Sequence, residues 1–266
     1  MQDIDKLLQQ ITVLESNQHY RVGDIINRMG IERSENSRVQ ILHQEQFKGS
    51  ILRDYLNEIS TDEFKKIPLS ETESCKKFHP FTGKFINPKK ERNYKLLADI
   101  VRTKSNQYPR PSSIELCINL RSGDVLTTNA NEKGALRGKG SLYLLKENQK
   151  EDTLIRLIQK KLIKYKKINC ITFVTAMHFG DHPWAKIFKY NKEKKLENIK
   201  LYDQLFSSIA SSFPSIRLKL LDFNSFSGYR KIDYQICYLC SARHLIADAG
   251  GFSEQIKLIR NELINK

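Results

Sequence analysis

Long apolar stretches are missing from this sequence of 266 residues. No run of about 18 apolar residues occurs, which excludes a helix long enough to cross a bilayer. The N-terminus, Met1-Gln2-Asp3-Ile4-Asp5, is acidic where a signal peptide would be basic and then apolar. These absences predict a cytoplasmic protein whose membrane contact, if it has any, is peripheral.

Glycine, proline and cysteine are also scarce. With only 12 Gly and 7 Pro beside 39% hydrophobic residues, the composition is typical of a folded chain with a core. The five cysteines form no disulfide framework. Cys237 and Cys240 make a CxxC motif, but no second pair completes a zinc site. We therefore expect both to be buried free thiols in a reducing compartment.

Positive charge is abundant, with a formal net charge of +15. Residues 1–110 hold 19 Lys and Arg against 15 Asp and Glu, and residues 111–266 hold 26 against 15. Such a field attracts nucleic acid, anionic lipid or phosphorylated ligands. A different explanation is that the lysines only solvate a helix face, since Lys160, Lys161, Lys164 and Lys167 recur at helical spacing.

The first 110 residues have a mainly helical pattern. Residues 1–30 are predicted as an N-terminal helix whose apolar seam over residues 3–16 would form a homo-oligomer or meet an anionic membrane. Two alternatives are a helix that packs within the chain and a helix-turn-helix over residues 24–38. Residues 31–110 are predicted as a mostly helical region, with helices over residues 44–59 and 92–102, and as a candidate for a reduced acceptor domain.

From residue 111 to residue 266 strands alternate with helices, which predicts an α/β fold with a parallel, Rossmann-like sheet flanked by helices. Expected strands cover residues 114–120, 169–176, 216–221 and 245–248. Expected helices cover residues 152–164, 198–213, 233–242 and 253–263. Because ligands bind at the carboxyl ends of such strands, the polar residues after each strand are the candidates for a site.

The segments after the first and last strands suit a phosphate. Arg121 can hold phosphate oxygens with two parallel hydrogen bonds, Gly123 permits a sharp turn and Asp124 can orient the arginine. After the last strand, Gly250 and Gly251 allow close backbone approach. In the same segment Ser253 can cap a helix whose N-terminus favours an anion. Each segment taken alone is better explained as an ordinary turn.

The second strand is followed by Met177-His-Phe-Gly-Asp-His-Pro-Trp184. His178, Asp181 and His182 could bind a metal, but their spacing is not an established ligand pattern. They are also candidates for a general base.

Taken in order, these segments resemble the motifs of the α-1,2/α-1,6 fucosyltransferase superfamily. The motif His-x-Arg-x-x-Asp corresponds to Asn119-Leu-Arg-Ser-Gly-Asp124, with Asn119 in place of the histidine. The motif Phe-Ser-Asp-Asp before a tryptophan is similar to Phe179-Gly-Asp-His-Pro-Trp184. A third motif, a helix led by Asp and followed by a strand and a Phe-Ser loop, corresponds to Asp233 through Ser253, where Phe252 and Ser253 match.

The resemblance covers about residues 110–266 and implies a GT-B-type donor domain. It further implies a GDP-sugar donor with fucose favoured, inversion at the anomeric carbon, and neither a metal nor another cofactor. The motif arginine of the family binds the donor diphosphate, which gives that role to Arg121. A second Rossmann-like domain, as GT-B enzymes have, is not evident in residues 1–110.

The leading hypothesis is therefore a glycosyltransferase that binds a nucleotide sugar and a glycan acceptor, with a catalytic base among His178, Asp181 and His182. The expected donor-binding residues are Arg121, Gly123, Asp124, Asp233, Gly250, Gly251, Phe252 and Ser253. The alternatives are a basic protein that binds nucleic acid or another polyanion through its lysine-rich face, and a relative that has lost turnover.

Overall fold

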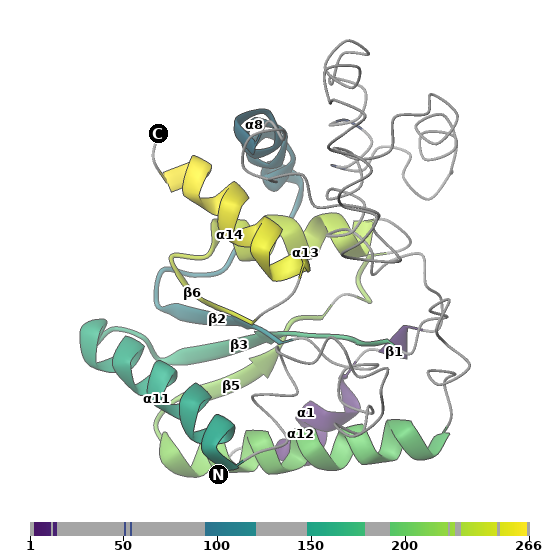
Figure 1. The fold of residues 1–266 in the computed structure, drawn as a ribbon, viewed down its shortest axis with the longest axis vertical. Helices are drawn as coiled ribbons and strands as arrows, with labels where there is room; N and C mark the ends of the chain where they lie inside the picture. The colour runs from purple at the N-terminus through teal and green to yellow at the C-terminus, as the bar shows by residue number, and fades with distance from the viewer. Residues whose placement is uncertain are drawn as a thin grey trace, which may run out of the picture.

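A four-stranded parallel sheet with helices on both faces forms the centre of the protein (Figure 1). The computed structural model describes residues 3–11, 13–14, 51, 54, 94–120, 148–178, 192–222, 224–226, 230–248 and 251–264. The strands are β2 (Glu115–Asn119), β3 (Cys170–Val174), β5 (Arg217–Leu220) and β6 (His244–Ala247), in the order β5-β3-β2-β6. Every neighbouring pair is parallel, which confirms the predicted α/β class and the four predicted strands.

The burial of the strands follows their position in the sheet. All residues of β2 and β3 are buried, as expected for central strands covered on both faces. The edge strand β5 begins with the exposed Arg217 and alternates from there. Successive side chains of β2 enter different cores, since Cys117 joins one apolar cluster and Leu116 and Ile118 join the other.

Two helical layers complete these cores (Figure 1). One face of the sheet is covered by α8 (Tyr94–Lys104), α13 (Arg230–Ser241) and α14 (Gly251–Ile264), and the short helix η3 (Ser105–Gln107) follows α8. The other face is covered by α1 (Ile4–Gln9), α11 (Asn148–Lys164) and α12 (Lys192–Ser212). The helices predicted for residues 92–102, 152–164, 198–213, 233–242 and 253–263 are thus confirmed, with ends displaced by up to six residues.

The N-terminal segment differs from its prediction. The helix expected over residues 3–16 is only α1, because Val13–Leu14 form the strand β1, which pairs in parallel with β4 (Met177–His178). The apolar seam also has a partner inside the chain, since Leu7 is buried in the core beside α12. Contact of this segment with a second copy or a membrane remains a prediction. Residues 15–30 lie outside the described residues.

Residues 31–93 are described only at Ile51 and Asp54, which are helical and fall within the helix predicted for residues 44–59. Among the described residues, no helix is both long enough and apolar enough to cross a membrane. Cys237 and Cys240 are buried free thiols, as predicted. Burial raises the pKa of Cys237 to about 12, so this thiol is protonated and inert at neutral pH.

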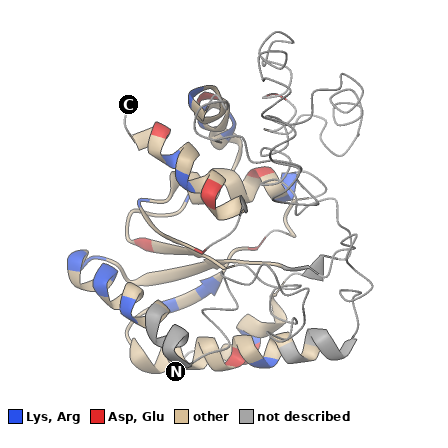
Figure 2. Cartoon of the chain, in the orientation of Figure 1, with Lys and Arg blue, Asp and Glu red and all other residues tan. Residues whose placement is uncertain are grey.

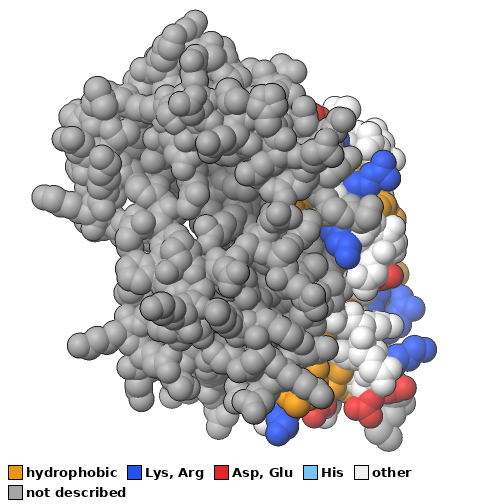
Figure 3. Space-filling view, turned by 90° about the vertical axis from the view of Figure 1, so that its right-hand side faces the viewer, with side chains coloured by type: hydrophobic (Ala, Val, Ile, Leu, Met, Phe, Trp, Pro, Cys, Tyr) orange, Lys and Arg blue, Asp and Glu red, His pale blue; other side chains and the backbone are white. Residues whose placement is uncertain are grey.

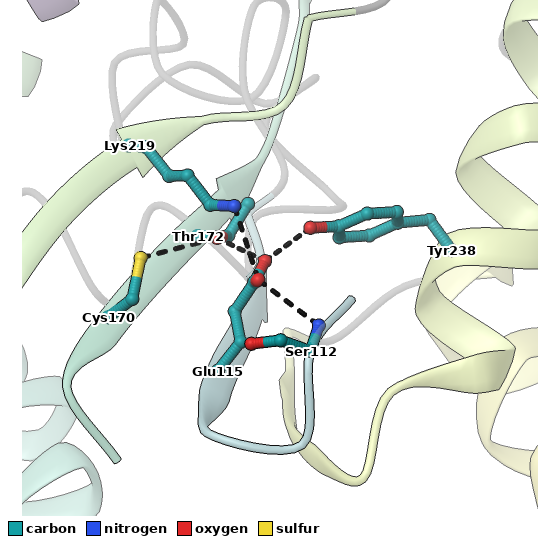
Figure 4. A network of polar contacts seen from close by, with 6 residues as sticks. All are labelled: Ser112, Glu115, Cys170, Thr172, Lys219 and Tyr238. Atoms are coloured by element: carbon teal, nitrogen blue, oxygen red, sulfur yellow. Dashed lines mark hydrogen bonds and ion pairs between the residues drawn. The ribbon is translucent and has the colours of Figure 1, made fainter. Parts of the chain in front are cut away.

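A buried carboxylate at the start of β2 connects the sheet to the helical layer above it (Figure 4). Glu115 Oε1 accepts hydrogen bonds from the Thr172 hydroxyl, at 2.5 Å, and from the Tyr238 hydroxyl. Glu115 Oε2 accepts from Lys219 Nζ at 3.1 Å and from the Ser112 N–H at 3.3 Å. The donors belong to β3, α13, β5 and the turn before β2, so one side chain contacts all of them.

The charged form of Glu115 is favoured in this setting. Burial alone would raise the pKa of Glu115, but the hydrogen bonds from Thr172, Tyr238 and Lys219, together with the Lys219 charge, outweigh it. The pKa is therefore lowered from its ordinary 4.5. A carboxyl group whose pKa is lower in the folded state contributes stability above its unfolded pKa and loses it in acid.

Glu115→Gln should lower the free energy of unfolding at neutral pH by about 1–2 kcal/mol, because it weakens the charge-assisted hydrogen bonds from Thr172, Tyr238 and the 39% exposed Lys219. Urea denaturation at pH 7 measures this loss, and Asp203→Asn, at an exposed position on α12, is the control. The difference between wild type and Glu115→Gln should shrink as the pH falls below 4.5, where the wild-type carboxylate takes up a proton. Equal urea midpoints for the two proteins at pH 7 would contradict a stabilising role.

Candidate functional site

The strand order creates a natural ligand position at the carboxyl ends of β2 and β6. From the inner strand β2 the chain proceeds to β3 and β5 on one side, and β6 lies on the other side of β2. In open parallel sheets, ligands bind at the carboxyl edge where the strand order reverses in this way. The two strand ends lie together there, since the N–H of Asp248 donates to the carbonyl of Asn119 at 3.1 Å.

The first turn of α14 lies beside this position. Asn119 Nδ2, at the end of β2, donates a hydrogen bond to Ser253 Oγ over 2.7 Å, and both side chains are buried. The two residues are 134 positions apart in the sequence, so the bond holds the start of α14 against the end of β2. The first N–H groups of an α-helix have no partner within the helix, and they carry a partial positive charge. The geometry thus brings an anion-favouring helix end to the reversal point of the sheet.

The structure describes five of the predicted site residues. Ser253 and Gly251 belong to the first turn of α14, and Phe252 between them packs partly buried against the apolar core. His178 belongs to β4, which follows the carboxyl end of β3. The fifth, Asp233, is buried in the first turn of α13. The predicted residues outside the described part are Arg121, Gly123, Asp124, Asp181, His182 and Gly250.

Sequence reasoning missed other polar contacts at this edge. The hydroxyls of Thr175, just after β3, and Tyr202, on α12, lie 2.7 Å apart, and both residues are buried. In the sequence Asn119 stands out only as a substitution in a motif, whereas in the structure its amide donates a hydrogen bond to Ser253. The position of Asn119 in the sequence points to this contact, because a polar residue at the end of a buried strand needs a hydrogen-bond partner.

An exposed carboxylate follows β5 at the carboxyl edge of the sheet. Figure 3 views the molecule from the side towards which the strands run, and the described side chains along the margin of that view include basic and acidic ones. Asp222, exposed after β5, accepts hydrogen bonds from the Asn224 N–H at 2.7 Å and the Ser225 hydroxyl at 3.3 Å. This carboxylate therefore shapes a local turn.

Asp233 lies in a setting that disfavours its charge. One carboxylate oxygen accepts the N–H of Ile51 at 3.0 Å. Burial raises the pKa of Asp233 to about 7, opposed by the Ile51 N–H and the Lys104 ammonium. Lys104 is itself paired with Asp54 at 2.7 Å, and that carboxylate raises the pKa of Asp233 further. Asp233 thus connects α13 to the segment containing Ile51 and holds a proton over part of the physiological range.

Comparisons with protein families, with curated proteins and with solved structures found no match to this chain. Within the described ranges, no group of three His, Cys, Asp or Glu side chains is arranged to hold a metal ion. Three observations on the described residues define the candidate site. They are its position at the carboxyl edge of the sheet, the Asn119–Ser253 hydrogen bond and the start of α14.

Asp233→Asn should stabilise the protein at pH 8 and have little effect at pH 4. The carboxyl has an ordinary pKa of 3.8 and a folded pKa of about 7, so the folded state binds its proton more tightly. Stability is consequently lost as the pH rises from about 4 to about 7, and the loss is constant above that. Asparagine mimics the protonated form and retains the acceptor for Ile51.

Thermal unfolding of wild type and Asp233→Asn between pH 4 and pH 8 measures the effect. The gain in Tm should grow with pH up to about 7 and then level off. Asp203→Asn, at an exposed position on α12, makes the same substitution outside the core and is the matched control. A variant that is less stable than wild type at pH 8 would show that the carboxylate is needed in its charged form.

Proposed function

We propose that this protein is a glycosyltransferase whose residues 111–266 form a GT-B-type donor domain for a GDP-linked sugar, with fucose favoured. The reaction would be an inverting, metal-independent transfer to a glycan acceptor. The observation that supports it best is the hydrogen bond between Asn119 and Ser253. It joins the first and third of the motif segments that resemble the fucosyltransferase superfamily, at the edge of a parallel sheet where nucleotides bind.

The diphosphate is assigned to the space between the segment after β2 and the first turn of α14. Arg121 follows Asn119 by two residues and would grip one phosphate with its planar guanidinium. The N–H groups at the start of α14 would hold the other phosphate without a second buried charge. Ser253 is engaged by Asn119, so its role would be to position this turn. Gly251, the first residue of α14, would allow the phosphate to approach the backbone.

Transfer of the sugar requires two further things of the protein. Negative charge develops on the leaving diphosphate, and Arg121 and the start of α14 would stabilise it. The acceptor hydroxyl needs a general base. His178 is one candidate, because it follows the carboxyl end of β3, the strand that neighbours β2 in the sheet. Asp181 and His182 follow closely in the sequence and are the other candidates.

Calorimetric titration of GDP tests the donor site. Arg121→Ala should weaken GDP binding about tenfold to a hundredfold, because a charge-assisted hydrogen bond is worth about 1.5–3 kcal/mol. Gly251→Val should cause a comparable loss by blocking the approach to the backbone. Arg217→Ala is the matched control, since Arg217 begins β5 at the opposite edge and is exposed. A loss of GDP binding confined to Arg217→Ala would place the diphosphate at the amino edge. If the wild-type protein binds UDP as tightly as GDP, the proposed preference for a guanine nucleotide is wrong.

Substitution of each candidate base separates catalysis from binding. Among His178→Ala, Asp181→Asn and His182→Ala, one variant should lose GDP-fucose turnover by at least about a hundredfold. Its affinity for GDP should stay at the wild-type value, because the base acts on the acceptor. Turnover is measured as the release of GDP when an acceptor glycan is present. Without a glycan, the slower hydrolysis of the donor by water is measured in the same way. Wild-type turnover in all three variants would remove these residues from the reaction.

A further inference from the structure

Basic residues gather at the amino edge of the sheet, opposite the proposed donor site. The basic surface consists of the exposed Arg156, Lys160, Lys164, Lys166, Lys167, Arg217 and Arg243, with the partly exposed Lys161 among them. They lie on the second half of α11 or directly before or at the start of β3, β5 and β6. Figure 2 shows the end of α11 as a run of blue turns. The sequence from Leu154 to Cys170 contains no Asp or Glu.

Two aromatic rings lie among these cations at the amino edge. The rings of Tyr165 and His244 lie 4.2 Å apart at this edge, and the ammonium groups of Lys161 and Lys164 are 5.9 and 5.3 Å from the Tyr165 ring centroid. The pKa of His244 is lowered, first by burial and then by Arg243 and Lys161. Among the described residues, none of the cations in the basic surface forms an ion pair. The positive charge is therefore uncompensated within this part of the chain.

Exposed aliphatic side chains accompany the charges. Ile163 is 67% exposed and Leu157 is 39% exposed, and both lie on α11 among the lysines. The main apolar face of α11 packs against the sheet, so these two side chains stand on its outer, basic side. Aliphatic side chains that stand among exposed lysines can enter the interface of an anionic membrane. Lysine stems can run along the apolar region while their ammonium groups reach the phosphates. A nucleic acid would use the cations but would gain nothing from Ile163. Tyr165, which could stack on a base, already packs against the His244 ring in a tilted arrangement.

We propose that the basic surface docks the protein on a membrane that carries anionic phospholipids. Ile163 enters the boundary between head groups and acyl chains, and the surrounding lysines and arginines contact the phosphates. The carboxyl edge of the sheet, which lies at the other end of the strands, then faces away from the bilayer. This surface is separate from the proposed donor site, so the proposal stands or falls independently of glycosyl transfer.

Sedimentation with vesicles tests the docking. The full-length protein should bind vesicles of phosphatidylcholine with phosphatidylserine and should not bind vesicles of phosphatidylcholine alone. Lys160→Glu/Lys164→Glu should reduce binding by about tenfold or more, since each basic residue near an anionic surface contributes separately. Lys95→Glu/Lys257→Glu, at exposed positions on α8 and α14, changes the net charge equally and should bind as wild type does. Thermal unfolding confirms that both double variants are folded.

Ile163→Ser distinguishes a membrane from a nucleic acid. This variant keeps every charge, and it should lose vesicle binding at least several-fold while any residual binding to an oligonucleotide is unchanged. The proposal is overturned if wild type fails to bind the phosphatidylserine vesicles, or if both double variants bind them equally. It is also overturned if Ile163→Ser binds them as wild type does, because the surface would then be a general polyanion site.

Discussion

The buried carboxylate of Glu115 is the interaction on which the arrangement of the sheet depends. Its two oxygens accept from Thr172 on β3, Lys219 on β5 and Tyr238 on α13, so a single side chain fixes three strands and one helix relative to one another. Burying this charge would be unfavourable without these donors, and with them the pKa of Glu115 is lowered. A slip of one residue in β2 would turn Glu115 towards the other face of the sheet, away from the Tyr238 hydroxyl. The network therefore selects the register.

The same register also sets the position of Asn119 in the candidate site at the other end of the strands. With Glu115 opposite Cys170, Asn119 falls opposite Val174 and Ala247, at the point where all three strands end. From there its amide reaches Ser253, and α14 begins beside the end of β2. A slip of one residue would point the Asn119 side chain to the opposite face of the sheet, away from α14. The proposed donor site thus depends on a carboxylate at the far edge of the sheet.

The sequence predicts elements well where a local pattern determines them, as in the apolar, β-branched run of β3 and the regular apolar spacing of α11. Parallel topology also predicts that the first strand's end meets the last helix's start, and the contact between Asn119 and Ser253 agrees with it. The pairing of β1 with β4 could not be predicted, because two residues carry no period. The contact of Asp233 with Ile51 spans 182 positions and leaves no local signal. Glu115 looked like one more strand residue, since its four donors lie in separate segments.

One property of the fold gives its two edges opposite electrostatic character. Because helices run antiparallel to the strands they connect, their N-termini gather at the carboxyl edge and their C-termini at the amino edge. The partial positive charge at the start of α14 favours an anion beside Asn119. The end of α11 favours cations, which Lys161 and Lys164 supply in its last turn. This effect is confined to the last turn of a helix, so it does not account for cations beyond helix ends, such as Arg243, nor for the exposed Ile163. The proposed membrane contact accounts for both of these features at the amino edge.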